Sequence, residues 1–164
     1  MENKKIRYAA FKDYLRRNYS GPYMATDIVI RHEAGSKRGI VLIERKNPPF
    51  GLALPGGIAE DIPFYQNAVK EAKEETGLDI EIDDRDRPLC VLSELGQDPR
   101  EFIASVAYTA KGNGHLRPLR DEDARSAAVY TKDELIELLK KDIWAFPHHK
   151  RILNIYLEQK WKTD

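Results

Sequence analysis

The chain has 164 residues, which is the size of one ordinary domain with room for a real hydrophobic core. Hydrophobic residues make up 41% and charged residues 33% of the chain, a composition that suits a soluble globular protein and excludes a disordered tail. The 27 Lys and Arg residues balance the 27 Asp and Glu residues, so no global electrostatic field attracts nucleic acid or an anionic membrane. We therefore expect one domain over residues 1–164 that handles phosphate groups, if at all, through a local site.

The cysteine content and the absence of long apolar segments bear on the compartment. The single Cys90 excludes an intramolecular disulfide and a cysteine-based metal site, which points to a reducing compartment. No segment approaches the roughly 20 apolar residues that a membrane-spanning helix needs, and the N-terminal segment lacks the apolar core of a signal peptide. We expect a cytoplasmic protein that binds neither nucleic acid nor membranes.

The first half of the chain predicts one helix, a hairpin and a series of loops. Aromatic and leucine side chains recur at helical spacing near the N-terminus before a Ser-Gly-Pro sequence, so residues 1–20 are expected to form a helical extension. Two β-rich runs flank a turn that contains Gly35, which predicts a β-hairpin. The Pro-Gly-Gly sequence at residues 55–57 is expected to interrupt regular secondary structure. The helix is expected at residues 6–19 and the strands at 24–31 and 39–44.

The second half of the chain predicts three helices and four strands. Apolar and small side chains recur at helical spacing from Phe64, and Gly77 supplies the C-terminal stop. Thr131 and Glu134 have the spacing of a capping box, and residues 111–114 predict a tight turn. The helices are expected at residues 64–76, 132–140 and 148–160, and the strands at 80–82, 89–95, 102–109 and 127–130. This order indicates an α/β domain with helices on both sides of a mixed sheet.

The first of these three helices concentrates carboxylates. At about 100° per residue, Glu71, Glu74 and Glu75 share one helix face. In a generic helix such a face is usually solvated and neutralised by nearby lysines, here Lys70 and Lys73. The preceding Pro-Gly-Gly sequence favours a second interpretation, because glycines let the backbone pass close to a ligand. Carboxylate oxygens on a rigid face suit Mg²⁺, which bridges to substrate phosphates and neutralises developing charge.

The segment from Gly56 to Leu78 resembles the sequence box of the Nudix hydrolases. Glu71 stands at the Glu of the box Arg-Glu, and Glu74 and Glu75 stand at its Glu-Glu pair. The resemblance implies a Nudix-like α/β/α sandwich with a mixed β-sheet. It also implies hydrolysis of a nucleoside diphosphate linked to another moiety, with Mg²⁺ or Mn²⁺ held by the three glutamates. Glu74 and Glu75 are expected to take part in catalysis as well.

Three positions depart from the box. Lys70 replaces the box Arg, which in the family orients a glutamate through a bidentate pair, and Lys keeps the charge but not the fork. Ala72 is smaller than the usual aliphatic residue. The first box Glu falls at Ile62 when counted from Gly56, or at Pro63 when counted from Gly57, and neither residue is acidic. Glu60 and Asp61 are the nearest carboxylates. These departures leave open a catalytically weakened Nudix-fold module that binds nucleotides or regulates another process.

Further segments from residue 23 to about 157 resemble the ADP-ribose pyrophosphatase branch of the family. ADP-ribose is therefore the first candidate substrate, and nucleoside triphosphates or dinucleoside polyphosphates are the alternatives. The sequence Asp-Pro-Arg at residues 98–100 matches a motif of that branch in which Arg100 reaches a phosphate or ribose, although a plain turn fits equally well. Gly56 and Gly57 are expected to line the substrate site. Members of the branch often form homodimers, for which the N-terminal helix is a candidate interface.

Two further groups of charged residues are candidates for the site. The family often supplies a catalytic base from a loop beyond the box, and Asp121, Glu122 and Asp123 align with that acidic loop. Glu122 is the first candidate and Asp123 the second, and an exposed acidic loop without a function fits either residue about as well. Arg45, followed by Lys46 at a strand end, is the candidate for binding a phosphate, and a solvated strand end is the alternative.

Two pairs of residues near the C-terminus are expected to have structural roles. His148 and His149 are adjacent on a helix, where their side chains point about 100° apart, and no third ligand is evident. We therefore expect roles at the helix start or in packing. Trp144 and Phe146 are more typical of a core than of a surface that stacks on a base.

Overall fold

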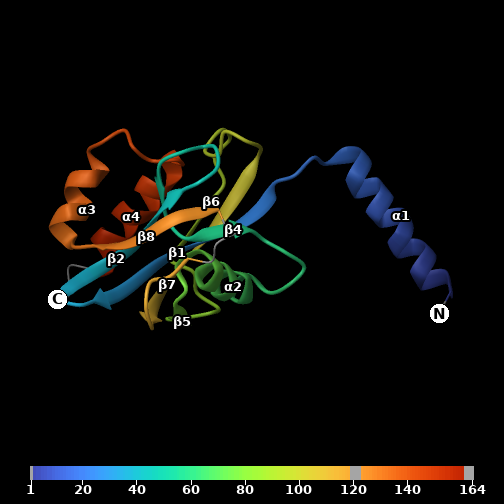
Figure 1. Ribbon diagram of the computed structural model, residues 1–164. Coiled ribbons are helices and arrows are strands. Elements are labelled where there is room, and N and C mark those ends of the chain that lie inside the picture. Colours follow the sequence, from blue (N-terminus) through green and yellow to red (C-terminus); the bar gives the residue numbers. More distant parts are fainter. Residues whose placement is uncertain (1, 119–122, 161–164) are drawn as a thin grey trace.

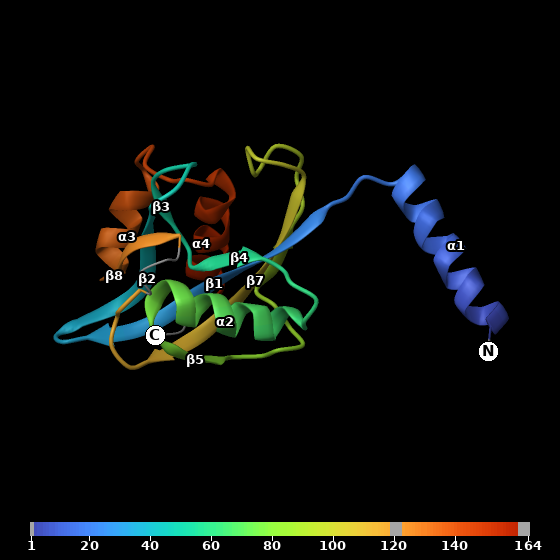
Figure 2. The same cartoon turned by 45° about the vertical axis from the view of Figure 1, so that its right-hand side comes forward.

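A mixed β-sheet forms the middle layer of the protein, and helices cover both of its faces (Figure 1). The computed structural model describes residues 2–118 and 123–160. The strands are β1 (Tyr23–Ala34), β2 (Lys37–Arg45), β3 (Leu52–Ala53), β4 (Gly56–Ile58), β5 (Asp79–Ile82), β6 (Cys90–Leu92), β7 (Ile103–Asn113) and β8 (Ala124–Tyr130). The helices are α1 (Glu2–Asn18), α2 (Phe64–Thr76), α3 (Lys132–Leu139) and α4 (Pro147–Lys160). Helix α2 lies on one face of the sheet, and α3 and α4 lie on the other (Figure 2). The expected α/β/α sandwich is confirmed.

Strand β1 is the centre of the sheet. It pairs in parallel with β7, from Tyr23 opposite Ile103 to Arg31 opposite Lys111. It pairs antiparallel with β2 through the predicted hairpin, and antiparallel with β4. The sheet runs in the order β3-β2-β1-β7-β5, while β8 joins β2 and β6 joins β7. The sheet is therefore mixed, as expected.

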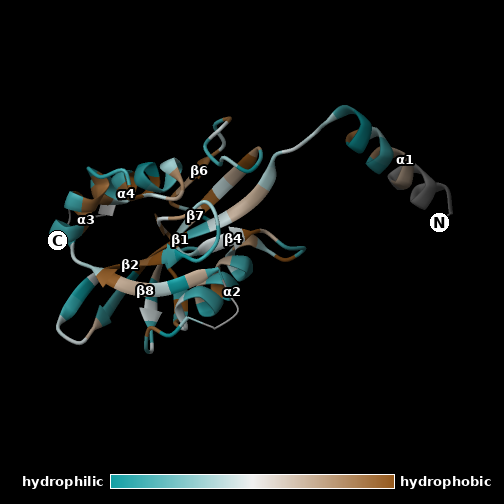
Figure 3. Ribbon diagram, turned by 45° about the horizontal axis from the view of Figure 1, so that its top comes forward, coloured by the Kyte–Doolittle hydropathy of each residue, from teal (hydrophilic) through white to brown (hydrophobic). Residues whose placement is uncertain are grey.

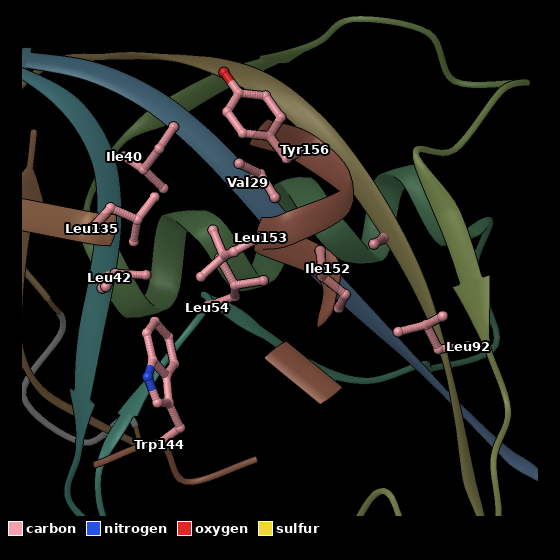
Figure 4. Close-up of a cluster of buried hydrophobic side chains, with 11 residues drawn as sticks. Val29, Ile40, Leu42, Leu54, Leu92, Leu135, Trp144, Ile152, Leu153 and Tyr156 are labelled. Carbon is pink, nitrogen blue, oxygen red and sulfur yellow. The ribbon is translucent and has the colours of Figure 1, made fainter. Parts of the chain in front are cut away.

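Strand β1 is buried on both faces because its side chains alternate between two cores. Val29 packs on the side of α3 and α4, in the cluster that includes Leu153 (Figure 4). Ile28 and Ile30 pack on the opposite side, in the cluster that includes Ala72 of α2. Each fully buried aliphatic side chain contributes about 1.5–3 kcal/mol relative to an exposed one. These two cores hold α2 and α4 at fixed positions on either side of β1.

Helix α2 has the bounds that its sequence predicts. Ala68 and Ala72 are completely buried, and their small side chains let the helix approach the sheet closely. The helix ends at Gly77, whose φ of 78° is left-handed and whose N–H donates to the carbonyl of Lys73. The N-terminal cap and capping box of α3, formed by Thr131 and Glu134, are also as expected.

Two glycine-containing segments that were expected to be turns are strands. Residues 111–113 continue β7, so the turn predicted at residues 111–114 was wrong. A Cβ at Gly112 would lie 2.9 Å from side-chain atoms of Ile30 and Leu78, so glycine is needed there for close packing. The break predicted at residues 55–57 lies at residues 54–55, between β3 and β4, and was wrong only for the two glycines, because Gly56–Ile58 form β4 and pair with β1.

Other strand ends differ slightly from expectation. Strand β6 is limited to Cys90–Leu92, and β8 begins at Ala124 instead of at Ala127. Cys90 is half-buried.

Helix α1 projects away from the sandwich in both Figure 1 and Figure 2. The side chains of Phe11 and Tyr14 in this helix, and of Tyr19 just after it, are exposed and contact one another. The ring centroids of Phe11 and Tyr14 are 6.4 Å apart, and those of Tyr14 and Tyr19 are 6.0 Å apart. Figure 3 shows the most hydrophobic residues on the strands inside the sandwich, beneath helices that carry many hydrophilic ones. In the described part of the chain, no helix combines the length and apolar character needed to cross a membrane.

Candidate active site

Two glutamates of α2 lie against the short strand β4. The side chain of Glu75 is buried, and its Oε2 accepts a hydrogen bond from the backbone N–H of Gly56 at 2.8 Å. A Cβ at Gly57 would lie 2.6 Å from the carboxylate carbon of Glu71. Gly57 therefore lets the carboxylate of Glu71 approach the backbone, and the N–H of Gly56 binds the carboxylate of Glu75, at the place where the sequence predicts a substrate site.

The third glutamate is paired with a lysine of the same helix. The Nζ atom of Lys70 lies 3.1 Å from Oε2 of Glu74, 2.9 Å from Oε1 of Glu60 and 4.0 Å from Oε1 of Glu71. The hydrogen bonds to Glu60 and then to Glu74 raise the pKa of Lys70, so its charge is maintained. Lys70, at the position of the box Arg, thus ties a loop carboxylate to the acidic face of α2.

The pKa of Glu75 is raised to about 8, first because the group is buried. The hydrogen bond from Gly56 opposes this shift, and the negative charge of Glu71 adds to it. At neutral pH the buried carboxyl group therefore resists ionisation unless a positive charge comes close. A bound cation would supply that charge.

The chemistry of the three glutamates fits a divalent metal ion. Their hard carboxylate oxygens are the ligands that Mg²⁺ and Mn²⁺ prefer. Among the described residues, the ligand atoms of Asp27, His148 and His149 all lie within 4.8 Å of one another. The carboxylate oxygens of the three glutamates do not meet this criterion, so the glutamates would have to move closer together to share one ion. Glu74 is held by Lys70, so a cation that used all three glutamates would compete with that ammonium group.

Two arginines and both glycines of β4 line a small cavity. The cavity holds about 90 Å³, and its lining includes Arg45, Arg100, Gly56 and Gly57. The guanidinium carbons of Arg45 and Arg100 lie 5.0 and 4.9 Å from the ring centroid of Phe146. Phe146 is buried, as expected, and it supports both cations. The structure therefore brings together the two arginines that the sequence selects as substrate-binding residues.

Arg45 is buried and held from two sides. Its Nε donates to the carbonyl of Pro49 at 3.0 Å, and its Nη2 lies 3.7 Å from Oδ2 of Asp123. Asp123 also accepts a hydrogen bond from the side chain of Asn47 at 2.5 Å. Asp123 therefore orients Arg45 at the cavity. Glu122, the first candidate for the base, lies outside the described residues, as does its neighbour Asp121.

Arg100 forms a local ion pair with Asp98, which the sequence did not predict. Its Nε and Nη2 donate to the two carboxylate oxygens of Asp98 at 3.0 and 2.8 Å. Burial alone would raise the pKa of Asp98, but the hydrogen bonds from Arg100 outweigh burial and lower it. The loop therefore has both properties considered from the sequence, since it is a turn fixed by Asp98 and it presents an arginine to the cavity.

Asp27 is a buried aspartate that lines the cavity and was not predicted from the sequence. Oδ1 of Asp27 lies 3.1 Å from Nε2 of His149, and Oδ2 lies 3.6 Å from Nε2 of His148 and accepts a hydrogen bond from Ser105. Burial alone would raise the pKa of Asp27, but His149 and His148 lower it well below its usual range. The expectation that the histidines lack a third partner was wrong, because β1 brings Asp27 between them. The signal was a single acidic residue inside the apolar run of β1.

The hydrogen bonds of His149 favour a structural network over a metal centre. The backbone N–H of Leu54 donates to Nδ1 of His149 at 2.9 Å, so the proton of the neutral ring must lie on Nε2, facing Asp27. Burial lowers the pKa of His149, which keeps the ring neutral. A metal at Nε2 would have to displace this proton. The packing role expected for the histidines thus agrees with their contacts.

Comparisons with a family model and with solved structures identify the same family. The model of the NUDIX domain family matches residues 22–152. No sequence among the curated proteins matches the chain. The NUDIX domain of Shewanella oneidensis NrtR, determined with ADP ribose, is 19% identical with a TM-score of 0.67, over 90% of this chain and 97% of that one.

Two other solved structures share the fold. An ADP-ribose pyrophosphatase from Streptococcus suis is 23% identical with a TM-score of 0.61, over 84% of this chain and 91% of that one. A bifunctional NMN adenylyltransferase/ADP ribose pyrophosphatase from Francisella tularensis, determined with AMP and a Mn ion, is 19% identical with a TM-score of 0.67, over 96% of this chain and 47% of that one. The family model covers most of the sandwich, including α2 and β4 with their glutamates and glycines, and the chain therefore belongs to the Nudix hydrolase family.

Proposed function

We propose that the protein is a divalent-metal-dependent hydrolase that cleaves the pyrophosphate of a nucleoside diphosphate derivative. ADP-ribose is the first candidate substrate, with AMP and ribose 5-phosphate as products. The observation that carries the proposal is that two arginines line the same cavity as the glycines of β4, which contact Glu71 and Glu75 of α2. The structural neighbours that bind ADP ribose or are named ADP-ribose pyrophosphatases support the choice of substrate.

The size of the cavity limits what it takes from the substrate. Its volume of about 90 Å³ is well below the roughly 300–1,000 Å³ of a site that encloses a whole small molecule. It suits one phosphoryl group, and the nucleoside would lie outside it. Arg45 and Arg100 supply donors that match phosphate oxygens, and Phe146 keeps both guanidinium planes in place.

The glutamates of α2 are the proposed metal ligands. Glu71, Glu74 and Glu75 would hold Mg²⁺ or Mn²⁺, and the bound ion would neutralise phosphate charge and lower the pKa of a water molecule. Without the ion, the positive charge of Lys70 lies next to Glu74 and Glu71 and offsets the repulsion between these two carboxylates. Glu122 remains the first candidate for the base, because Asp123 is already engaged by Arg45 and Asn47.

The experiment that tests the function follows AMP release from ADP-ribose with Mg²⁺ or Mn²⁺, next to nucleoside triphosphates and dinucleoside polyphosphates. We expect ADP-ribose to be cleaved, and turnover to fall at least about 100-fold in Glu74→Gln and in Glu75→Gln. Glu137→Gln is the matched control, because Glu137 is an exposed helix glutamate paired with Lys140.

The outcomes separate the alternatives. Binding of ADP-ribose without turnover, with either metal, would favour a nucleotide-binding or regulatory module. Preference for a triphosphate or dinucleoside polyphosphate would keep the hydrolase and change the substrate. Full activity in both glutamate variants would overturn the proposed metal site.

We also propose that the protein forms a homodimer through α1 and acts in the cytoplasm. The exposed cluster of Phe11, Tyr14 and Tyr19 on and next to the projecting helix supports the first proposal. The single cysteine supports the second. Light scattering on the parent and on a Phe11→Ser/Tyr14→Ser variant tests the dimer, because the parent should have twice the mass of the variant.

A further inference from the structure

The loop between β6 and β7 carries Arg100 to the cavity, and Gln97 closes the base of this loop. Nε2 of Gln97 donates to the carbonyls of Leu92 at 2.9 Å and of Ile103 at 2.8 Å, at the end of β6 and the start of β7. The backbone carbonyl of Gln97 lies 3.1 Å from Nδ1 of His148. Since a carbonyl only accepts hydrogen bonds, Nδ1 of His148 carries a proton and donates.

His148 is fixed on its other sides as well. Its Nε2 faces Asp27 at 3.6 Å, and its ring meets the ring of His149 edge to face, with centroids 4.6 Å apart. The side chain is buried and lines the cavity. His148 therefore links the loop that carries Arg100 to α4 and, through Asp27, to the central strand.

This link bears on Arg100 because the pairing of Arg100 with Asp98 lies entirely within the loop. That pair moves with the loop and does not fix Arg100 relative to Phe146. An exposed ion pair between Arg151 and Glu94 also joins the loop to α4, but exposed pairs contribute only about 0–1 kcal/mol. The buried hydrogen bond from His148 to Gln97 is the stronger constraint.

We propose that His148 is a positioning residue for substrate binding, which holds the loop of Gln97 so that Arg100 meets a phosphate group in the cavity. Recognition of phosphate by guanidinium is directional, so a small displacement of the loop weakens it strongly. The identity of the bound group as a pyrophosphate rests on the proposed function. The placement of His148 rests on its contacts alone.

The test compares two amide substitutions of His148. In His148→Asn the amide N–H replaces the donor at Nδ1, whereas in His148→Gln it replaces the atom at Nε2 and leaves the carbonyl of Gln97 without its partner. The readout is the dissociation constant of inorganic pyrophosphate with Mg²⁺, measured by titration calorimetry. We expect it to rise about tenfold in His148→Gln and less than about threefold in His148→Asn.

Matched controls come from another buried histidine, which lies away from the cavity. His32 is on β1, and its Nδ1 lies 3.0 Å from the carbonyl of Gly112 on β7. It does not belong to the residues that line the cavity. His32→Gln and His32→Asn should leave the dissociation constant unchanged. Thermal denaturation of all four variants checks that each protein is folded.

A double-mutant cycle shows whether His148 acts through Arg100. In an Arg100→Ala background, His148→Gln should weaken pyrophosphate binding no further. Equal effects of the Asn and Gln variants, an undiminished effect of His148→Gln in the Arg100→Ala background, or no pyrophosphate binding by the parent would each overturn the proposal. The readout needs no turnover, so failure to cleave ADP-ribose would overturn the proposed function alone.

Discussion

The carboxylate of Glu71 occupies the space beside Gly57 that a side chain would otherwise fill, since a Cβ at residue 57 would lie 2.6 Å from the carboxylate carbon. Gly57→Ala should therefore push Glu71 away from β4. We expect affinity for Mn²⁺ to fall at least about tenfold, measured by electron paramagnetic resonance of the free ion. The control is Gly35→Ala in the β1–β2 turn, where φ is 61° and nothing lies within 4 Å. It should lower stability by about 1 kcal/mol and leave Mn²⁺ binding unchanged.

The raised pKa of Glu75 makes the stability of the metal-free protein depend on pH. The folded-state pKa is about 8, compared with an ordinary value of 4.5, so the folded state binds more protons between these values. The free energy of unfolding should therefore fall by roughly 3 kcal/mol as the pH rises from 5.5 to 8.5. Urea denaturation in EDTA at the two pH values measures this loss.

Two further measurements assign the pH dependence to Glu75. Glu75→Gln should reduce the slope, because an amide does not titrate. Mg²⁺ added to the parent at pH 8.5 should restore stability, because the ion favours the ionised carboxylate. An equal slope in Glu75→Gln would show that another group is responsible.

Phe146 supports both guanidinium groups of the cavity, so its ring should matter for substrate affinity more than for the chemical step. Phe146→Leu keeps an apolar side chain but removes the aromatic face beneath Arg45 and Arg100. We expect KM for the substrate to rise about fivefold to thirtyfold with little change in kcat, since each of the two contacts is worth about 0.5–1 kcal/mol. Steady-state kinetics measures this, with Phe11→Leu on the exposed helix α1 as control. A fall in kcat at constant KM would contradict it.

Asp27 is the acceptor on which Ser105, His148 and His149 converge, and its side chain is buried. Asp27→Asn removes the charge that faces both histidines and leaves part of the network unsatisfied. We expect a loss of about 2–4 kcal/mol of stability, measured by urea denaturation at pH 7. Asp79→Asn, which removes an exposed carboxylate paired with Lys73, should cost less than about 0.5 kcal/mol. A similar loss in both variants would contradict the role of Asp27.

Local patterns predicted the elements whose signals lie within a short stretch of chain. Helix α2 combines apolar periodicity with a left-handed Gly77, and its bounds agree with the structure. The capping box of Thr131 and Glu134 was predicted for the same reason. The face shared by Glu71, Glu74 and Glu75 follows directly from helix geometry. These features depend on residues a few positions apart.

Features that depend on distant partners were not predicted. Gly112 belongs to a strand because it pairs with Ile80 of β5, a residue distant in sequence, and the residues next to Gly112 give no sign of this. Asp27 and His149 come from opposite ends of the chain and meet because α4 covers the face of the sheet beside β1. Such contacts arise from the tertiary arrangement, which a local pattern does not contain.

The parallel pairing of β1 with β7 also constrains the order of events during synthesis. Tyr23 pairs with Ile103, so β1 lacks its parallel partner until the ribosome has released the chain as far as β7. Contacts between such distant segments form slowly. Nascent chains that end before residue 103 should expose the apolar edge of β1 and bind chaperones or aggregate. The glutamates of α2 are therefore synthesised before the fold that positions them can close.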